Sequence, residues 1–256
     1  MLEIIPLTAL KDNYIWMLIN KINQCVVIID PSEHEPVLEY IQSRNLNPIA
    51  ILITHHHWDH VGGITGLTKK YNIPVYTPEK EFVEGSTNPV SEGDIISLPE
   101  LDLEINVLDV PGHTSGAIAY HTEKMVFSGD TLFTGGCGRL FEGSPTQMYS
   151  SLSKIKKLPT KTLVYCGHEY TIPNLQFAAA VEIDNKTIQR RLELAQKTRD
   201  ENQPTVPATL EIEKQTNPFL RCNEQSIINS ASMRAGRTLD NPAEVFATIR
   251  NWKDSF

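Results

Sequence analysis

Short apolar runs, each ending at a polar or glycine-containing turn, dominate the first two thirds of the chain. Eight runs rich in Ile, Val and Leu predict β-strands, at residues 2–7, 14–19, 25–30, 50–54, 103–110, 117–122, 125–130 and 162–167. Between them, residues 35–44, 61–71 and 145–158 place apolar side chains three and four positions apart, which is typical of helices packed on a sheet. The pattern therefore predicts an α/β protein built from layers of sheet and helix.

The pattern changes after His168. Residues 174–201 and 242–253 show helical periodicity, whereas the stretch between them is irregular and contains Pro204, Pro207 and Pro218. We therefore expect two domains, a mixed α/β domain over residues 1–170 and a smaller helical domain over residues 171–256.

Charge and composition narrow the range of partners. The chain has 23 Lys and Arg against 31 Asp and Glu, a net charge of −8, which argues against general electrostatic binding to nucleic acid or to an anionic membrane. The longest apolar run that we find, Tyr14–Ile19, has six residues, far short of the roughly 20 that span a bilayer. The first residues show no secretory signal pattern. We therefore expect a cytoplasmic monomer that acts on a small molecule.

The four cysteines are widely separated and form no C-x-x-C pair; they are Cys25, Cys137, Cys166 and Cys222. They lack the spacing of a thiolate zinc site and the density of a disulfide scaffold. We expect free, mostly buried thiols.

Candidate metal ligands cluster directly after the predicted strand at residues 50–54. Four of the eight histidines fall within six residues there: His55, His56, His57 and His60. Asp59 lies among them, and His113, Asp130 and His168 each follow a later apolar strand. Imidazole and carboxylate groups are ligands for zinc and similar divalent ions, and a loop can turn several of them toward one point.

A different interpretation is that these residues cap strands and turns, as Asp and His often do. For any one of them alone that interpretation is the stronger, but for the whole set metal binding is. His56 points away from its neighbours if the loop begins extended, and His34 and His121 stand in polar surroundings. We expect these three histidines not to be ligands.

The sequence T-H-x-H-x-D-H at residues 54–60, with the later His, Asp and His, resembles the metallo-β-lactamase superfamily. That resemblance implies a four-layered αββα fold with a two-metal site. Within the superfamily the chain is similar to the glyoxalase II (hydroxyacylglutathione hydrolase) family, through GDTLFTGGCGRLFEG, VYCGHEYT, NPFLR and RNWKD. The similarity spans nearly the whole chain and includes the helical C-terminal domain.

The resemblance implies how the ligands divide. His55, His57 and His113 bind one metal, Asp59, His60 and His168 bind the other, and Asp130 bridges both, with Asp59 and Asp130 as the catalytic carboxylates. Five neutral imidazoles and two carboxylates leave two divalent ions with net positive charge, which lowers the pKa of a bridging water toward neutrality. The resulting hydroxide attacks a carbonyl carbon. Zinc is the ion we expect, although iron and manganese suit the same ligands.

The resemblance names the substrate as S-D-lactoylglutathione, a thioester hydrolysed to D-lactate and glutathione. It implies that four residues bind the glutathione part: Arg139, Tyr170, Arg250 and Lys253. Arg250 and Lys253 lie three apart on the last predicted helix, so their charged groups share one face; a solvated face is the alternative. Some family members carry tyrosine where this chain has Phe141, which leaves one hydroxyl contact in doubt.

Two rival functions remain open. One is the glutathione-persulfide dioxygenase of the same superfamily, which contains a single iron; the helical C-terminal region with Arg250 and Lys253 favours the hydrolase instead. The other is a non-catalytic metal-binding relative, which would show lost ligands, and none is lost here.

Overall fold

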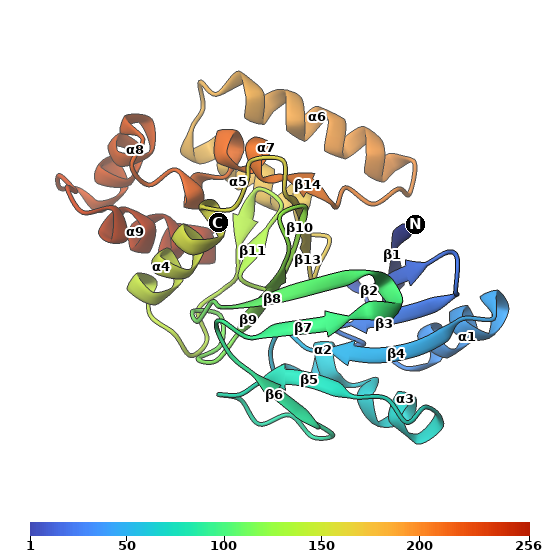
Figure 1. The fold of residues 1–256 in the computed structure, drawn as a ribbon. Coiled ribbons are helices and arrows are strands. Elements are labelled where there is room, and N and C mark those ends of the chain that lie inside the picture. Colours follow the sequence, from blue (N-terminus) through green and yellow to red (C-terminus); the bar gives the residue numbers. More distant parts are fainter. The chain divides into compact units, whose positions relative to one another are not determined.

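The computed structural model describes all 256 residues, and the apolar runs of the sequence form strands in it (Figure 1). All eight predicted strands are present, as β1 (Leu2–Ala9), β2 (Asn13–Asn20), β3 (Cys25–Ile29), β4 (Asn47–Leu52), β8 (Leu103–Asp109), β9 (Ile118–His121), β10 (Met125–Gly129) and β13 (Leu163–Cys166). The chain divides into two units, one of Met1–Asp109 with Ser115–Thr122 and one of Val110–Thr114 with Glu123–Phe256.

The main sheet of the first unit has the strand order β1-β2-β3-β4-β5-β6, with β5 at Val75–Pro78 and β6 at Asn88–Val90. Strands β1 to β3 are antiparallel, and β3 to β6 run parallel. Every residue of β3 is buried, which explains its unbroken apolar sequence, because a strand covered on both faces has no polar side. Separately, β7 (Ile95–Leu98), β8 and β9 form an antiparallel meander.

Helices α1 (Glu35–Arg44) and α3 (Ile64–Lys70) supply one side of the core of this unit (Figure 1). Val37 and Ile41 of α1 and Leu67 of α3 are buried in a cluster with alternate residues of β2, such as Ile15 and Met17. Pro36 near the start of α1 and a left-handed Asn45 at its end limit the helix on both sides. The short helix α2 (Trp58–Val61) lies between β4 and α3 in the sequence.

In the second unit, β10 and β13 pair in parallel, and β14 (Ala208–Thr209) pairs antiparallel with β13. A small hairpin, β11 (Leu132–Phe133) and β12 (Gly136–Cys137), follows β10. The helices are α4 (Pro145–Lys156), α5 (Thr171–Val181), α6 (Lys186–Asp200), α7 (Leu210–Thr216), α8 (Gln225–Ala235) and α9 (Pro242–Asp254). Helix α4 begins with a reciprocal capping box between Ser144 and Gln147. No helix of the protein combines the length and the apolar character needed to cross a membrane.

The structure corrects three details of the predicted pattern. The helical stretch predicted at 174–201 is two helices: α5 ends at Val181, and α6 begins after Asn185. The Asn185 side chain caps α6 by accepting from the backbone N–H groups of Thr187 and Ile188 at 3.0 and 3.3 Å. The stretch predicted to be irregular contains α7 and α8. The pattern also missed the short strands β5, β6 and β7, of which β5 and β6 contain a proline.

Asn185→Ala removes the N-cap of α6, and we expect the free energy of unfolding to fall by about 0.5–2 kcal/mol. Urea unfolding of the variant beside Arg190→Ala, an exposed position on the same helix, measures the difference. Equal stability of the two variants would show that the cap does not set the start of α6.

Candidate metal centre

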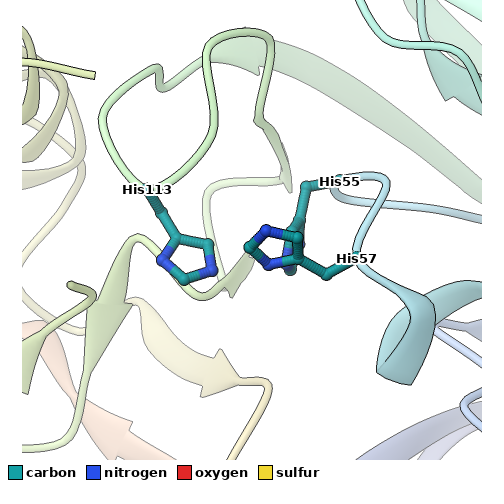
Figure 2. A group of neighbouring side chains, drawn as sticks. All are labelled: His55, His57 and His113. Atoms are coloured by element: carbon teal, nitrogen blue, oxygen red, sulfur yellow. The ribbon is translucent and has the colours of Figure 1, made fainter. Parts of the chain in front are cut away.

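The first group of candidate ligands lies just beyond the carboxyl end of β4. His55 Nε2 lies 3.1 Å from His57 Nδ1, so the two rings direct different nitrogens to the same side of the loop (Figure 2). His57 is the N-cap residue of α2 and has an extended ψ of 141°. The ring centroids of His55 and His57 lie 4.8 Å apart, and that of His56 lies 5.1 Å from His57.

Asp59 and His60 follow in the first turn of α2. His60 Nε2 lies 3.7 Å from Asp59 Oδ2, and the His60 side chain is only 1% exposed. The opposite nitrogen of His60, Nδ1, lies 3.0 Å from Asp30 Oδ2. Asp30 therefore orients the His60 ring, leaving Nε2 on the side of Asp59.

Asp30 organises this loop from the end of β3. Its Oδ1 accepts from the Thr54 backbone N–H at 2.8 Å, and its Oδ2 accepts from the Thr54 hydroxyl at 2.6 Å. Thr54 Oγ1 in turn lies 3.1 Å from His55 Nδ1. Because the hydroxyl proton goes to Asp30, the His55 Nδ1–H donates to Thr54, and His55 Nε2 carries the lone pair.

The second group lies in the other unit, at the ends of the parallel neighbours β10 and β13. Asp130 directly follows β10 and His168 lies two residues beyond β13; His168 Nε2 is 3.3 Å from Asp130 Oδ2. His113, which Figure 2 also labels, lies in the segment Val110–Thr114 and places its Nε2 3.4 Å from the same oxygen. The structure thus places the two predicted ligands His113 and His168 beside the carboxylate of the third, Asp130.

His113 is oriented like His55 and His60. Its Nδ1 lies 2.8 Å from the backbone carbonyl oxygen of Arg139. A carbonyl only accepts, so Nδ1 carries the proton and Nε2 keeps the lone pair that faces Asp130. The His168 ring is stacked on Tyr170, with ring centroids 4.7 Å apart and planes 4° from parallel.

Both groups have the chemistry of metal ligands. Two nitrogens at about 2.0–2.1 Å from one zinc ion lie roughly 3.3 Å apart in tetrahedral geometry, close to the 3.1 Å between His55 and His57. Outward hydrogen bonds from Nδ1 to a carboxylate, a hydroxyl and a carbonyl are the usual partners of metal-binding histidines. These His and Asp groups are able to bind metal ions, and the same donors suit zinc, iron and manganese.

Glu81 is a buried carboxylate that the sequence analysis did not select. Its Oε2 accepts from the His56 backbone N–H at 2.7 Å and lies 3.0 Å from His56 Nδ1, while Oε1 accepts from the Gly116 N–H at 3.0 Å. Glu81 therefore binds the residue between the two candidate ligands His55 and His57. Neither Glu81 nor Asp30 stands near a motif, so only the structure connects them with the ligand loop.

The predicted substrate-binding residues occupy different environments. Arg139 is half exposed, and its Nε lies 3.2 Å from Asp254 Oδ1. Tyr170 lies at the start of α5, against His168 and Phe133. Phe141 is 61% exposed, with its ring centroid 5.3 Å from that of His113.

Arg250 and Lys253 both lie on α9 but differ in burial. Arg250 is 5% exposed and donates from Nη1 to the Cys137 carbonyl at 2.8 Å and from Nη2 to Asp254 at 3.1 Å. Lys253 donates to the Pro173 carbonyl at 2.9 Å and lies over the ring of Phe177. Burial, and then the nearby Arg250 charge, lower the pKa of Lys253 to about 8.

The cysteines of this unit do not supply a nucleophile. All four cysteines of the chain are free and buried, as predicted. Burial raises the pKa of Cys137 to about 11 and that of Cys166 to about 12. At neutral pH both stay thiols, and the thiolate is the reactive form.

Comparisons with known proteins place the chain in a family. Residues 13–168 match the model of the metallo-beta-lactamase superfamily, and residues 169–256 match that of the hydroxyacylglutathione hydrolase C-terminus. The hydroxyacylglutathione hydrolase of Nitrosomonas europaea is 51% identical, over 100% of this chain and 97% of that protein. This chain belongs to the hydroxyacylglutathione hydrolase family.

Two further similarities agree with this family. The hydroxyacylglutathione hydrolase of Nitrosomonas eutropha is also 51% identical, over the full length of both chains. The crystal structure of TTHA1623 in a di-iron-bound form has 27% identity and a TM-score of 0.60, over 84% of this chain and 100% of that one. The predicted metallo-β-lactamase fold with a helical C-terminal part is confirmed for this hydroxyacylglutathione hydrolase family member.

His55→Ala and His57→Ala should each lose bound metal, whereas His56→Ala should keep it. His55 Nε2 and His57 Nδ1 lie 3.1 Å apart, whereas His56 Nδ1 lies 3.0 Å from Glu81 Oε2. Elemental analysis of the three purified variants measures the contrast between adjacent positions. Equal metal loss in all three would show that the assignment of ligands along the loop is wrong.

Proposed function

We propose that this protein hydrolyses the thioester bond of S-D-lactoylglutathione, releasing D-lactate and glutathione. The observation that carries the proposal is the full-length similarity to hydroxyacylglutathione hydrolases, which includes the C-terminal match at residues 169–256. That match favours the hydrolase over the persulfide dioxygenase. The division of function proposed is a catalytic domain over residues 1–170 and a glutathione-binding domain over residues 171–256.

The proposed ligands divide between two divalent ions, with zinc first and iron or manganese as alternatives. His55, His57 and His113 would hold one ion, Asp59, His60 and His168 would hold the other, and Asp130 would bind both. The orienting hydrogen bonds of His55, His60 and His113 support their role as ligands. When bound, such ions supply a hydroxide nucleophile at neutral pH and stabilise the oxyanion that forms on the carbonyl.

The chain's own residues prepare this chemistry. Asp30 and Thr54 keep the Nε2 lone pairs of His55 and His60 available, and the Arg139 carbonyl does the same for His113. Asp59 and Asp130 offset the positive charge of the centre. A thioester suits such a site because a thiolate leaves without first being protonated, so no general acid has to be placed beside the leaving group.

Glutathione carries two carboxylates, and we propose that Arg139, Tyr170, Arg250 and Lys253 bind it. The half-exposed guanidinium of Arg139 and the Lys253 ammonium are the groups best placed for direct charge-assisted hydrogen bonds. Arg250 is buried against Cys137 and Asp254, so we propose that its positive charge attracts the glutathione carboxylates without a direct hydrogen bond.

The reducing cytoplasm is the proposed location, and the proposed form is a monomer. Four free cysteines without a disulfide suit a compartment that keeps thiols reduced.

The deciding experiment combines metal analysis of the purified protein with loss of thioester absorbance on S-D-lactoylglutathione. We expect about two equivalents of divalent metal and hydrolysis that stops when a chelator removes them. Metal-loaded protein that leaves the thioester intact would overturn the proposed function.

Asp130→Asn should lower kcat by about two orders of magnitude and change KM much less. An amide lacks the charge that holds two cations close together, whereas glutathione binding involves other residues. Metal content and steady-state kinetics are compared with Asp240→Asn, an exposed carboxylate on the surface. Full metal occupancy with wild-type turnover would remove Asp130 from the bridging position.

Lys253→Ala should raise KM for the glutathione thioester by about tenfold while kcat stays nearly unchanged, because the contact is remote from the reacting carbonyl. In the wild type, KM should rise as the pH increases through about 8, where Lys253 loses its proton. The variant should not show that step.

A small thioester without glutathione carboxylates is the control for Lys253. Wild type and Lys253→Ala should hydrolyse it equally well at pH 7 and pH 9. Equal losses on both substrates would indicate that Lys253 supports only the packing of α9.

A further inference from the structure

The turn that follows Asp130 is held by side chains from the helical part of its unit. Four residues bind the backbone of Phe133–Cys137: Asn174, Glu213, Asn217 and Arg250. Gly135 N–H donates to Glu213 Oε2 at 2.9 Å, and Asn217 Nδ2 lies 3.2 Å from the Phe133 carbonyl and 2.9 Å from the Gly136 carbonyl. The hairpin thus accepts hydrogen bonds from, and donates them to, side chains that lie 40 to 113 positions later in the chain.

Glu213 and Asn217 form the centre of this arrangement. Both are fully buried, Glu213 in the middle of α7 and Asn217 directly after this helix. Asn217 Nδ2 also lies 3.1 Å from Glu213 Oε2, and Arg191 of α6 pairs with Glu213 Oε1. A buried carboxylate is costly unless it is paired and hydrogen-bonded. Its position under the turn is therefore tightly determined.

The same turn touches two proposed metal ligands. Gly138 N–H donates to the Thr131 carbonyl at 3.3 Å, and a Cβ at Gly138 would lie 2.0 Å from the Asp130 carbonyl oxygen and 3.1 Å from His113 Nδ1. Arg139, the next residue, provides the carbonyl that accepts from His113 Nδ1. The orientation of the His113 ring therefore depends on where the turn places this carbonyl.

We propose that Glu213 and Asn217 are positioning residues for the metal centre, acting through the Phe133–Arg139 turn on His113 and Asp130. The inference rests on the proposed function for its kinetic consequence, but its effect on metal binding does not depend on the substrate. The helical part of the unit would then serve the metal ligands as well as the glutathione part of the substrate.

Asn217→Asp and Glu213→Gln test the proposal. Asn217→Asp keeps the acceptor for the Phe219 N–H but removes the donors to the turn, and Glu213→Gln removes the charge that pairs with Arg191. We expect each to weaken zinc binding by about tenfold, at the lower end of the effects seen for residues behind metal ligands. Competition with a chromophoric chelator measures this loss without any substrate.

The kinetic expectation is a fall in kcat of about tenfold with KM changed by less than about threefold, since ligand geometry rather than substrate contact is altered. Thr209→Ala is the matched control, because it removes the N-cap of the same helix α7 and touches no residue of the turn. It should lower the unfolding temperature and leave zinc binding and kcat unchanged.

Glu213→Gln and Asn217→Asp variants that unfold at a lower temperature but bind zinc and turn over like wild type would overturn the proposal. A rise in KM alone would also overturn it. If both variants fail to fold, Asn174→Ala replaces them, because it removes only the hydrogen bond to the Thr134 carbonyl. Zinc binding that is weaker by about threefold would then support the proposal. Unchanged zinc binding would refute it. A wild type that binds zinc but spares the thioester would refute the proposed function while leaving the chelator test valid.

Discussion

Metal-binding imidazole rings are almost always oriented by a hydrogen bond at the nitrogen that does not bind the metal, and three histidines of this structure are held in that way. His60 is held by the Asp30 carboxylate, His55 by the Thr54 hydroxyl and His113 by the Arg139 carbonyl. Each partner accepts the Nδ1 proton, so each leaves the Nε2 lone pair available. The loops that carry the ligands are consequently constrained at residues that are not ligands themselves.

Buried carboxylates provide most of that constraint. Asp30 and Glu81 each bind a backbone N–H and a side chain of the loop after β4, and Glu213 binds the turn after Asp130. An anion inside a protein remains charged only if several donors compensate for its lost hydration. Each carboxylate therefore keeps its hydrogen bonds in only one arrangement of the loop. Any other arrangement would leave a buried charge without donors, so the position of the loop is well determined.

Family membership and site geometry carry different parts of the functional argument. The fold alone hosts more than one chemistry, and its His and Asp ligands accept several metals. The match over residues 169–256 distinguishes this chain within the superfamily, and that region contains three of the four residues proposed to bind glutathione: Tyr170, Arg250 and Lys253. The same region holds the turn next to Asp130 and His113, so the part that favours the substrate also contacts the part proposed to hold the metal.

The sequence by itself predicted eight of the strands, most of the helices and the family, and it also nominated the ligands. Those features depend on local spacing: apolar runs predict β2 and β3, three- and four-residue periodicity predicts α1, and His55 to His60 are adjacent in the chain. The assignment of each ligand to an ion remains a prediction, although the structure brings His55 to His57 and both His113 and His168 to Asp130. Only the tertiary structure revealed Asp30, Glu81, Glu213 and Asn217, because their partners lie 24 to 84 residues away and no local pattern records such contacts. Burial also distinguishes two basic residues that the sequence places on one face of the last predicted helix, Arg250 and Lys253. Packing encloses the Arg250 guanidinium and lowers the pKa of the Lys253 ammonium to about 8.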